Sequence, residues 1–387
     1  MDNLVVFSAT TQGFLHKKRE VPCQDASGCY VDPQGRFAAI AVADGHGDPT
    51  CVRSDRGSAL VVDVALDCMR LFGESCLSAS EDSQGVRLMD ELSIPRRSDD
   101  VIRRLTDALL ARWYEAAMDD LSNEPLTPEE LDRASSYAAL YSNGQELEHA
   151  YGTTLIAALY VGDNLLLLQQ GDGRCVVLRE DASAFEPIPW DARCHENVTT
   201  SVSDTDAAES MRHAILHTDG EDSDIVACLL GSDGVEDSFH DEEGRWDYYR
   251  RLCMRLTDLH NARTRRKDFE SVLHETLPSF SKEGSGDDVS IAGMASMREL
   301  MMARDEFDDL IEQYQLGARL QEARAKLLSM ERMHEHLARA ASDGSEAQQD
   351  AFRRYDAVYE QLKAQTQQLE EDLLEWKRTQ EGSGQND

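Results

Sequence analysis

Four short acidic segments constrain this chain most, because each is expected where a strand runs into a loop. They are residues 23–25 (Cys-Gln-Asp), 44–47 (Asp-Gly-His-Gly), 232–234 (Ser-Asp-Gly) and 286–290 (Gly-Asp-Asp-Val-Ser). A carboxylate at a strand end is held rigidly, and a glycine beside it lets the backbone approach a cation closely. Convergent carboxylates offer only oxygen ligands, which favour Mg²⁺ or Mn²⁺ over zinc. The segments therefore predict a site for hard metal ions.

An Asp-Gly pair in isolation is better explained as a turn than as a metal ligand. We interpret Asp163 and Asp219 in this way. Asp44, Asp233 and Asp287 differ because they belong to a set of segments with a defined order.

Composition limits the classes of partner. The net charge of −35 argues against non-specific binding to nucleic acid or to an anionic membrane, since both reward basic surfaces. The nine cysteines are odd in number and form no CxxC pair, so neither a disulfide framework nor a structural zinc site is expected. The first ten residues do not resemble a signal peptide, and the apolar runs are too short to span a bilayer. These features predict a cytoplasmic protein.

Strand and helix patterns alternate through the first 300 residues. A capping box at Thr127-Pro128-Glu129-Glu130 predicts a helix start. We expect residues 73–98 to be irregular and residues 196–224 to form a mobile flap or a helical excursion. The segment 175–179 is expected to continue the sheet that contains 165–170. The predicted strands are 37–43, 153–161, 165–170, 175–179, 225–231 and 289–294, and the predicted helices are 54–72, 99–121, 246–259 and 267–276.

The pattern changes near residue 296, after which apolar residues recur at helical spacing. Gly344 can end one helix and Ser345 can cap the next. The sequence therefore predicts three parts: a domain over 1–296, a helical hairpin or coiled coil over 297–380, and a disordered tail over 381–387.

Six motifs follow one another along the chain in a fixed order. They are Cys-Gln-Asp-Ala (23–26), Val-Ala-Asp-Gly-His-Gly (42–47), Tyr-Gly-Thr-Thr-Leu (151–155), Gln-Gly-Asp-Gly-Arg (170–174), Gly-Ser-Asp-Gly-Val-Glu-Asp (231–237) and Gly-Asp-Asp-Val-Ser (286–290). In this order and at this spacing, the motifs resemble those of the bacterial-like branch of the PP2C family of metal-dependent protein phosphatases. The resemblance covers about residues 5–295 and implies an α+β fold: a four-layer α/β/β/α sandwich of two antiparallel sheets, followed here by the helical hairpin.

The resemblance implies a centre with two Mn²⁺ or Mg²⁺ ions. Asp44 would bridge both ions. The carbonyl of Gly45 and a more peripheral Asp25 would complete one shell, partly through water, and Asp233 and Asp287 would hold the other ion. His46 would lie near the leaving-group oxygen as a general acid. The alternative for His46 is a side chain that simply packs in the loop after its strand.

The chain departs from the family pattern at four places. Asp48 stands where a glycine is common, and Glu148 and His149 occupy the stretch where a third metal's carboxylate is usual. Asp288 replaces an asparagine and adds negative charge. The phosphate-binding arginine has no match at its usual spacing, and its candidate replacements are His16, Lys17, Lys18 and Arg19.

The leading hypothesis is a serine/threonine phosphoprotein phosphatase in signal transduction. Its partners would be a phosphorylated protein substrate and a cognate kinase. The alternative is a pseudophosphatase, a scaffold that binds phosphoproteins without turnover. The C-terminal helices could form a homodimer, dock a partner or cover the active-site cleft.

Overall fold

The computed structural model describes residues 4–78, 87–195, 198–220, 222–261, 266–342 and 344–383. These residues form two compact units, one ending at Arg304 and the other beginning at Asp305. Within the described ranges, no helix combines the length and the apolar run needed to cross a membrane.

The first unit is built on two antiparallel five-stranded sheets. The first sheet has the order β1-β10-β9-β6-β7 and the second has the order β2-β3-β4-β5-β8. The strands of the first sheet are β1 (Leu4–Thr11), β10 (Val289–Ser296), β9 (Ile225–Gly231), β6 (Arg174–Arg179) and β7 (Ala184–Phe185). Those of the second are β2 (Asp25–Val31), β3 (Phe37–Asp44), β4 (Leu155–Val161), β5 (Asn164–Gln170) and β8 (Arg212–His217).

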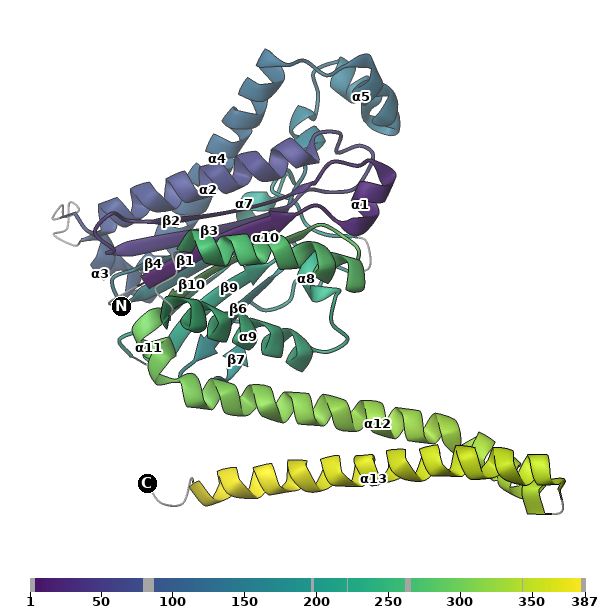
Figure 1. The fold of residues 1–387 in the computed structure, drawn as a ribbon. Coiled ribbons are helices and arrows are strands. Elements are labelled where there is room, and N and C mark those ends of the chain that lie inside the picture. Colours follow the sequence, from purple (N-terminus) through teal and green to yellow (C-terminus); the bar gives the residue numbers. More distant parts are fainter. Residues whose placement is uncertain are drawn as a thin grey trace. The chain divides into compact units, whose positions relative to one another are not determined.

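Alternation along β3 shows how the layers stack. Phe37, Ala39 and Ala41 face one way and belong to a core with helices on the outer side of the second sheet. Ile40 and Val42 face the other way and pack with residues of the first sheet. Because successive side chains of a strand point to opposite faces, a strand that is buried throughout must lie between two layers. The predicted four-layer α+β sandwich is confirmed (Figure 1).

Helices cover the outer faces of both sheets. α2 (Ser54–Cys76) and α4 (Pro95–Asn123) pack over the second sheet, and α9 (Glu242–Asn261) and α10 (Arg266–Glu283) over the first (Figure 1). The predicted capping box at Thr127 is present at the start of α5. The shorter helices are α1 (Phe14–Arg19), α3 (Leu88–Leu92), α5 (Pro128–Arg133), α6 (Ala138–Ser142), α7 (Ala207–Ser210), α8 (Asp233–Glu236) and α11 (Met297–Met302).

One prediction about the sheets is wrong, and one strand was not predicted. β6 does not continue the sheet of β5; the chain crosses to the other sheet after β5, where Gly171 has a positive φ of 101°. The stretch expected as a mobile flap or a helical excursion contains a short helix, α7, and also the unpredicted edge strand β8, which pairs with β5. Residues 196, 197 and 221 of that stretch lie outside the described ranges.

The segment expected to be irregular, residues 73–98, begins with the last turn of α2 and contains α3 and the start of α4. Its residues 79–86 lie outside the described ranges.

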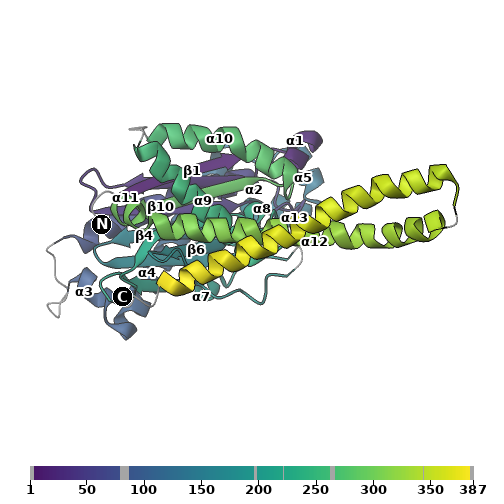
Figure 2. The ribbon, with the colours of Figure 1, turned by 60° about the horizontal axis from the view of Figure 1, so that its bottom comes forward.

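The second unit is a hairpin of two long helices, α12 (Arg304–Ser342) and α13 (Glu346–Ser383), shown in Figure 2. The helices meet at the predicted break and run antiparallel, since Arg324 contacts Glu370 and His334 contacts Asp356. Of the expected tail, residues 381–383 are helical and residues 384–387 lie outside the described part.

Candidate active site

The four acidic segments meet at one edge of the sandwich, although two of them have the opposite orientation from that predicted. Asp44 ends β3 and Asp233 follows β9, as expected. Asp25, however, is the first residue of β2, and Asp287 directly precedes β10. In antiparallel sheets, the start of one strand lies beside the end of its neighbour, so this alternation brings all four carboxylates to the same edge.

Three of these carboxylates lie close together: Asp25 is buried, and Asp44 and Asp233 are half-buried. Asp25 is the cross-strand partner of Asp44, and Asp233 is the neighbour whose charge acts most strongly on Asp44. Burial and the charge of Asp233 raise the pKa of both Asp25 and Asp44 well above the ordinary range. Burial likewise raises the pKa of Asp233 to about 7. Asp25 therefore lies within the cluster, not at its periphery.

The cluster fits divalent cations. Like charges at a buried site disfavour ionisation, and a cation would reverse that effect. Ser232 and Ser290 donate hydrogen bonds to the carboxylate of Asp25, yet its buried Oδ2 has no hydrogen-bond partner among the described residues. Carboxylate oxygens with a free acceptor position are the donors that Mg²⁺ and Mn²⁺ prefer.

Gly45 sits in a tight backbone cradle beside the cluster. A Cβ atom at this position would lie 2.5 Å from the carbonyl oxygen of Ser54 and 2.7 Å from that of Gln24. Only glycine fits there. The absence of a side chain leaves the backbone next to Asp44 able to approach a ligand.

Gln24 connects three of the acidic segments. Its main-chain N–H donates to Asp288 Oδ2 (2.6 Å), and its carbonyl accepts from the Gly45 N–H (3.0 Å). Its side-chain amide donates to the carbonyl of His46 (3.1 Å) and to Ser54 Oγ (2.5 Å). The middle residue of Cys-Gln-Asp thus fixes the loop that carries His46.

His46 is buried next to this loop. Burial and the neighbouring His149 lower its pKa to about 4. Its Nε2 is buried and has no hydrogen-bond partner among the described residues. His149 is itself held by Thr50 Oγ1 at 2.9 Å and by stacking on Tyr137. His46 therefore offers a ring nitrogen that no described side chain uses.

Asp288 is saturated by donors. It is 2 % exposed, and its two oxygens accept from the main-chain N–H groups of Gly13 (2.5 Å) and Gln24 (2.6 Å). Nδ1 of His16 lies 3.0 Å from Asp288 Oδ2. Burial alone would raise the pKa of Asp288, but His16 and the two N–H groups outweigh it and the pKa is lowered. The negative charge of Asp288 is thus compensated by the N–H groups of Gly13 and Gln24 and by the ring of His16.

His16, a candidate for phosphate binding, is engaged by acids. Besides its contact with Asp288, its Nε2 lies 3.4 Å from Asp287 Oδ1, and the close approach to Asp288 is the main reason that its pKa is raised. The other candidates, Lys17, Lys18 and Arg19, are exposed on α1. The structure thus places His16 among the acidic residues and the other three on the surface.

Two further acids lie near the cluster and were given no role from the sequence. Burial raises the pKa of Asp172, and Asp172 in turn contributes to the raised pKa of Asp233. Asp237 also raises the pKa of Asp233. Both belong to motifs recognised in the sequence, 170–174 and 231–237, which was the available signal.

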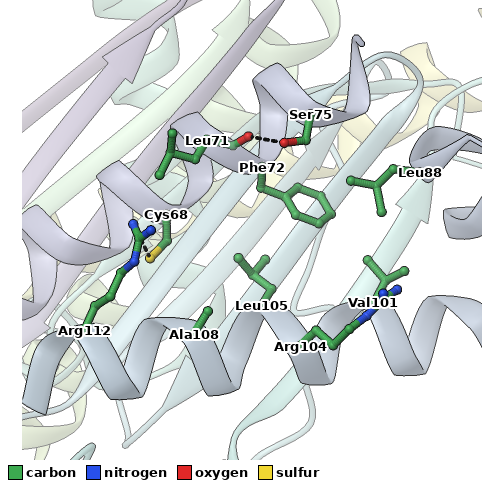
Figure 3. A pocket seen from close by; sticks show the side chains of 10 residues that line it. All are labelled: Cys68, Leu71, Phe72, Ser75, Leu88, Val101, Arg104, Leu105, Ala108 and Arg112. Atoms are coloured by element: carbon green, nitrogen blue, oxygen red, sulfur yellow. Dashed lines mark hydrogen bonds between the residues drawn. The ribbon is translucent and has the colours of Figure 1, made fainter. Parts of the chain in front are cut away.

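Figure 3 shows a pocket that is separate from the acidic cluster. Its volume is about 290 Å³, and it lies between α2 and α4. Leu71, Phe72 and Leu105 line it, with Arg112 at one end, and it contains none of the acidic site residues.

The protein phosphatase 2C family model matches residues 12–274. The chain belongs to this family. The match spans the first three acidic segments, and the fourth, at residues 286–290, lies just beyond it.

Solved structures that are similar to this chain include bacterial phosphatases. The serine/threonine phosphatase Stp1 from Staphylococcus aureus is 16 % identical and has a TM-score of 0.46, covering 76 % of this chain and 95 % of its own. PppA of Pseudomonas aeruginosa is 18 % identical (TM-score 0.42; 76 % and 98 % covered). The serine/threonine phosphatase PstP/Ppp of Mycobacterium tuberculosis is 16 % identical (TM-score 0.40; 76 % and 98 % covered). Among curated proteins, none matches the chain.

Proposed function

We propose that this PP2C-family protein is a metal-dependent serine/threonine phosphoprotein phosphatase. The observation that carries the proposal is the cluster of the buried Asp25 with the half-buried Asp44 and Asp233, whose mutual repulsion calls for cations. A structural role would not require three largely desolvated carboxylates to face one another without a basic partner.

Five groups would hold two Mn²⁺ or Mg²⁺ ions: the carboxylates of Asp25, Asp44, Asp233 and Asp287 and the carbonyl of Gly45. Bound ions of this kind supply an activated water nucleophile and neutralise charge on the phosphoryl oxygens.

The remaining roles belong to the chain's own residues. Asp44 would help to hold both ions, since it is paired across the strands with Asp25 and also feels the charge of Asp233. His46 would hold a proton near the leaving-group oxygen, because its Nε2 is unused by the protein. Gln24 would keep His46 in place through the loop carbonyl. Phosphate binding is proposed for Lys17 and Arg19, while His16 orients Asp287.

The expected surroundings of this activity are a phosphoprotein substrate, a cognate kinase and the cytoplasm. All nine cysteines are free thiols, and Sγ of Cys175 and Cys228 remain 3.8 Å apart without a bond. Free thiols in such number suit a reducing compartment. Residues 1–296 would form the catalytic domain and residues 297–380 a module for binding a partner or a second copy.

The test is hydrolysis of an aryl phosphate and of phosphoserine and phosphothreonine peptides with excess Mn²⁺. Asp233→Asn should reduce the rate on the order of 100-fold or more, since even groups behind the metal ligands are worth 10–100-fold. Asp219→Asn is the matched control, because Asp219 also precedes a glycine but is exposed. It should leave the rate unchanged.

Two results would count against the proposal. Wild-type protein that binds Mn²⁺ in a calorimetric titration but turns over no phosphoester would support the pseudophosphatase instead. Turnover that Asp233→Asn does not reduce would remove the carboxylate cluster from the chemistry.

A further inference from the structure

The two helices of the C-terminal hairpin pack on each other through a row of side chains on each helix, here called the seam, and most of these side chains remain partly exposed. The seam residues on both helices follow alternating spacings of three and four, the pattern of helices that pack along their length. Only Leu320, Ala341 and Thr366 among them are buried, and the others are partly exposed. Two helices cannot enclose such a seam, whereas a bundle of four can. The seam consists of Leu320, Ala323, Leu327, Met330, His334, Leu337 and Ala341 on α12 and Phe352, Tyr355, Tyr359, Leu362, Thr366, Leu369, Leu373 and Trp376 on α13.

One side of the hairpin carries two matched rows of side chains. Each row has a spacing of seven residues, so its members line up along one face of a helix. Met333 and Val358 each precede a member of a stacked pair, His334 and Tyr359, whose rings are 4.2 Å apart. In antiparallel helices, residues that precede facing seam positions lie on the same side. The rows are Arg319, Lys326 and Met333 on α12, and Val358, Gln365 and Asp372 on α13.

A hollow of about 370 Å³ lies between the two rows. Its lining includes the seam residues Ala323, Leu362 and Leu369. Arg319, Lys326 and the acid Glu322 contribute to it from α12, and Gln365, Gln368 and Asp372 from α13. Nearer the tip of the hairpin, Met333 is 50 % exposed and Val358 is 55 % exposed. This side therefore combines an apolar floor with two exposed apolar side chains, two basic residues on the α12 wall and an acid on the α13 wall.

We propose that this side of the hairpin binds the same side of a second copy, which makes the protein a dimer through a four-helix bundle. The two-fold axis would run along the hairpin, so that α12 of each copy lies over α13 of the other. The proposal does not rest on the phosphatase activity, since none of the residues in either row belongs to the active site.

Charge complementarity selects a second copy as the occupant. Arg319 and Asp372 line the same hollow from opposite walls. A two-fold axis parallel to the hairpin places Arg319 of each copy against Asp372 of the other, so the pair occurs two times in the dimer. The same operation brings Met333 against the second copy's Val358 and joins four exposed apolar side chains into one cluster. A tip-to-base arrangement would instead set α12 against α12, with basic rows facing each other.

The test is the molar mass of the full-length protein at micromolar concentration, by light scattering or sedimentation equilibrium. Wild type should have twice the 43.3 kDa of one chain. Met333→Lys combined with Val358→Lys should give the mass of one chain. Leu328→Lys is the matched control: Leu328 is 70 % exposed but follows a seam residue, so it lies on the opposite side and should leave the dimer intact.

A charge exchange separates a specific interface from misfolding. Arg319→Asp alone should weaken the dimer, because it sets two acids against each other. Arg319→Asp with Asp372→Arg should restore it, and circular dichroism should show equal helix content in all variants. Wild-type protein of monomer mass would overturn the proposal, and so would a dimer that neither the lysines nor the single charge reversal weakens.

Discussion

Two groups of charged side chains in the first unit are built in opposite ways. Arg53 is 2 % exposed, and its guanidinium donates to Glu130 (2.8 and 3.1 Å), to the carbonyls of Glu124 and Pro125, and to the hydroxyl of Tyr151. In the Asp25, Asp44 and Asp233 cluster, carboxylates face carboxylates. The carboxylates of the first group face a guanidinium, whereas those of the second face one another, and the proposed metal ions would supply the positive charge. A buried charge without compensation is thus the stronger sign of function.

The largest loss of stability is expected when Arg53 is removed from its group of carboxylate and carbonyl partners. Arg53→Met would leave Glu130 and Asp120 without their buried partner and should lower the free energy of unfolding by about 3–5 kcal/mol. Urea unfolding measures this. Arg56→Met is the control, because Arg56 is 37 % exposed at its side chain and binds Asp120 from the surface. Its loss should cost about 1 kcal/mol or less, and equal losses for both would refute the distinction.

We expect Mn²⁺ to stabilise the protein by binding the cluster of Asp25, Asp44 and Asp233. Mn²⁺ at 100 times its dissociation constant should stabilise the wild type by about 2.7 kcal/mol, because it binds the folded state only. The gain should be visible as a rise in the thermal unfolding midpoint and should vanish with EDTA. Asp44→Asn should lose most of this gain while Asp219→Asn retains it. An unchanged midpoint for the wild type at millimolar Mn²⁺ would count against the cluster as a metal site.

Asp288 allows a test of compensation inside the active site itself. Asp288→Asn would leave the N–H of Gly13 or Gln24 facing an amide NH₂ group and would remove the charge beside His16. We expect a loss of about 1–3 kcal/mol, the cost of an unsatisfied buried donor. Chemical denaturation of the metal-free protein measures it. No loss would mean that the asparagine usual in the family serves equally well here.

The smallest effect concerns pH. Arg53 and the Thr127 cap lower the pKa of Glu130 to about 2, although burial alone would raise it. A lowered pKa in the folded state gives stability that is present above the unfolded value of about 4.5 and is lost as the pH falls towards 2. Glu130→Gln should therefore flatten the fall of the unfolding midpoint between pH 4.5 and 2. An unchanged acid limb would contradict the assignment.

Local patterns predicted the fold well where one strand or helix is enough. β9 has the bounds expected from its apolar run, and the seam of α13 follows the predicted stripe, with Thr366 as a further buried member. The edge strand β8 was missed because its side chains are only partly buried and show no clear alternation. The crossing of the chain between β5 and β6 depends on which sheet has a free edge, which no local pattern encodes.

The site was predictable to the level of residue type and no further. The motifs identified the acids, but the burial of Asp25 depends on its register against Asp44. Likewise, His16 contacts Asp288, an acid more than 270 residues away in the chain. The residues next to His16 in the sequence therefore could not predict this contact. Distances in sequence carry no information about which charge is already compensated.

The pairing of β1 with β10 has a consequence for synthesis on the ribosome. The first strand of the sandwich must wait for residues 289–296, because β10 is its ladder partner among the described strands. At 5–20 residues per second, this interval is roughly 15 to 60 s. Asp287 and Asp288 arrive at the same late moment, so the nascent chain carries an unfinished acidic edge throughout that time. The hairpin is translated after these residues, so the proposed pairing of two copies would begin only when all strands of the first unit have been synthesised.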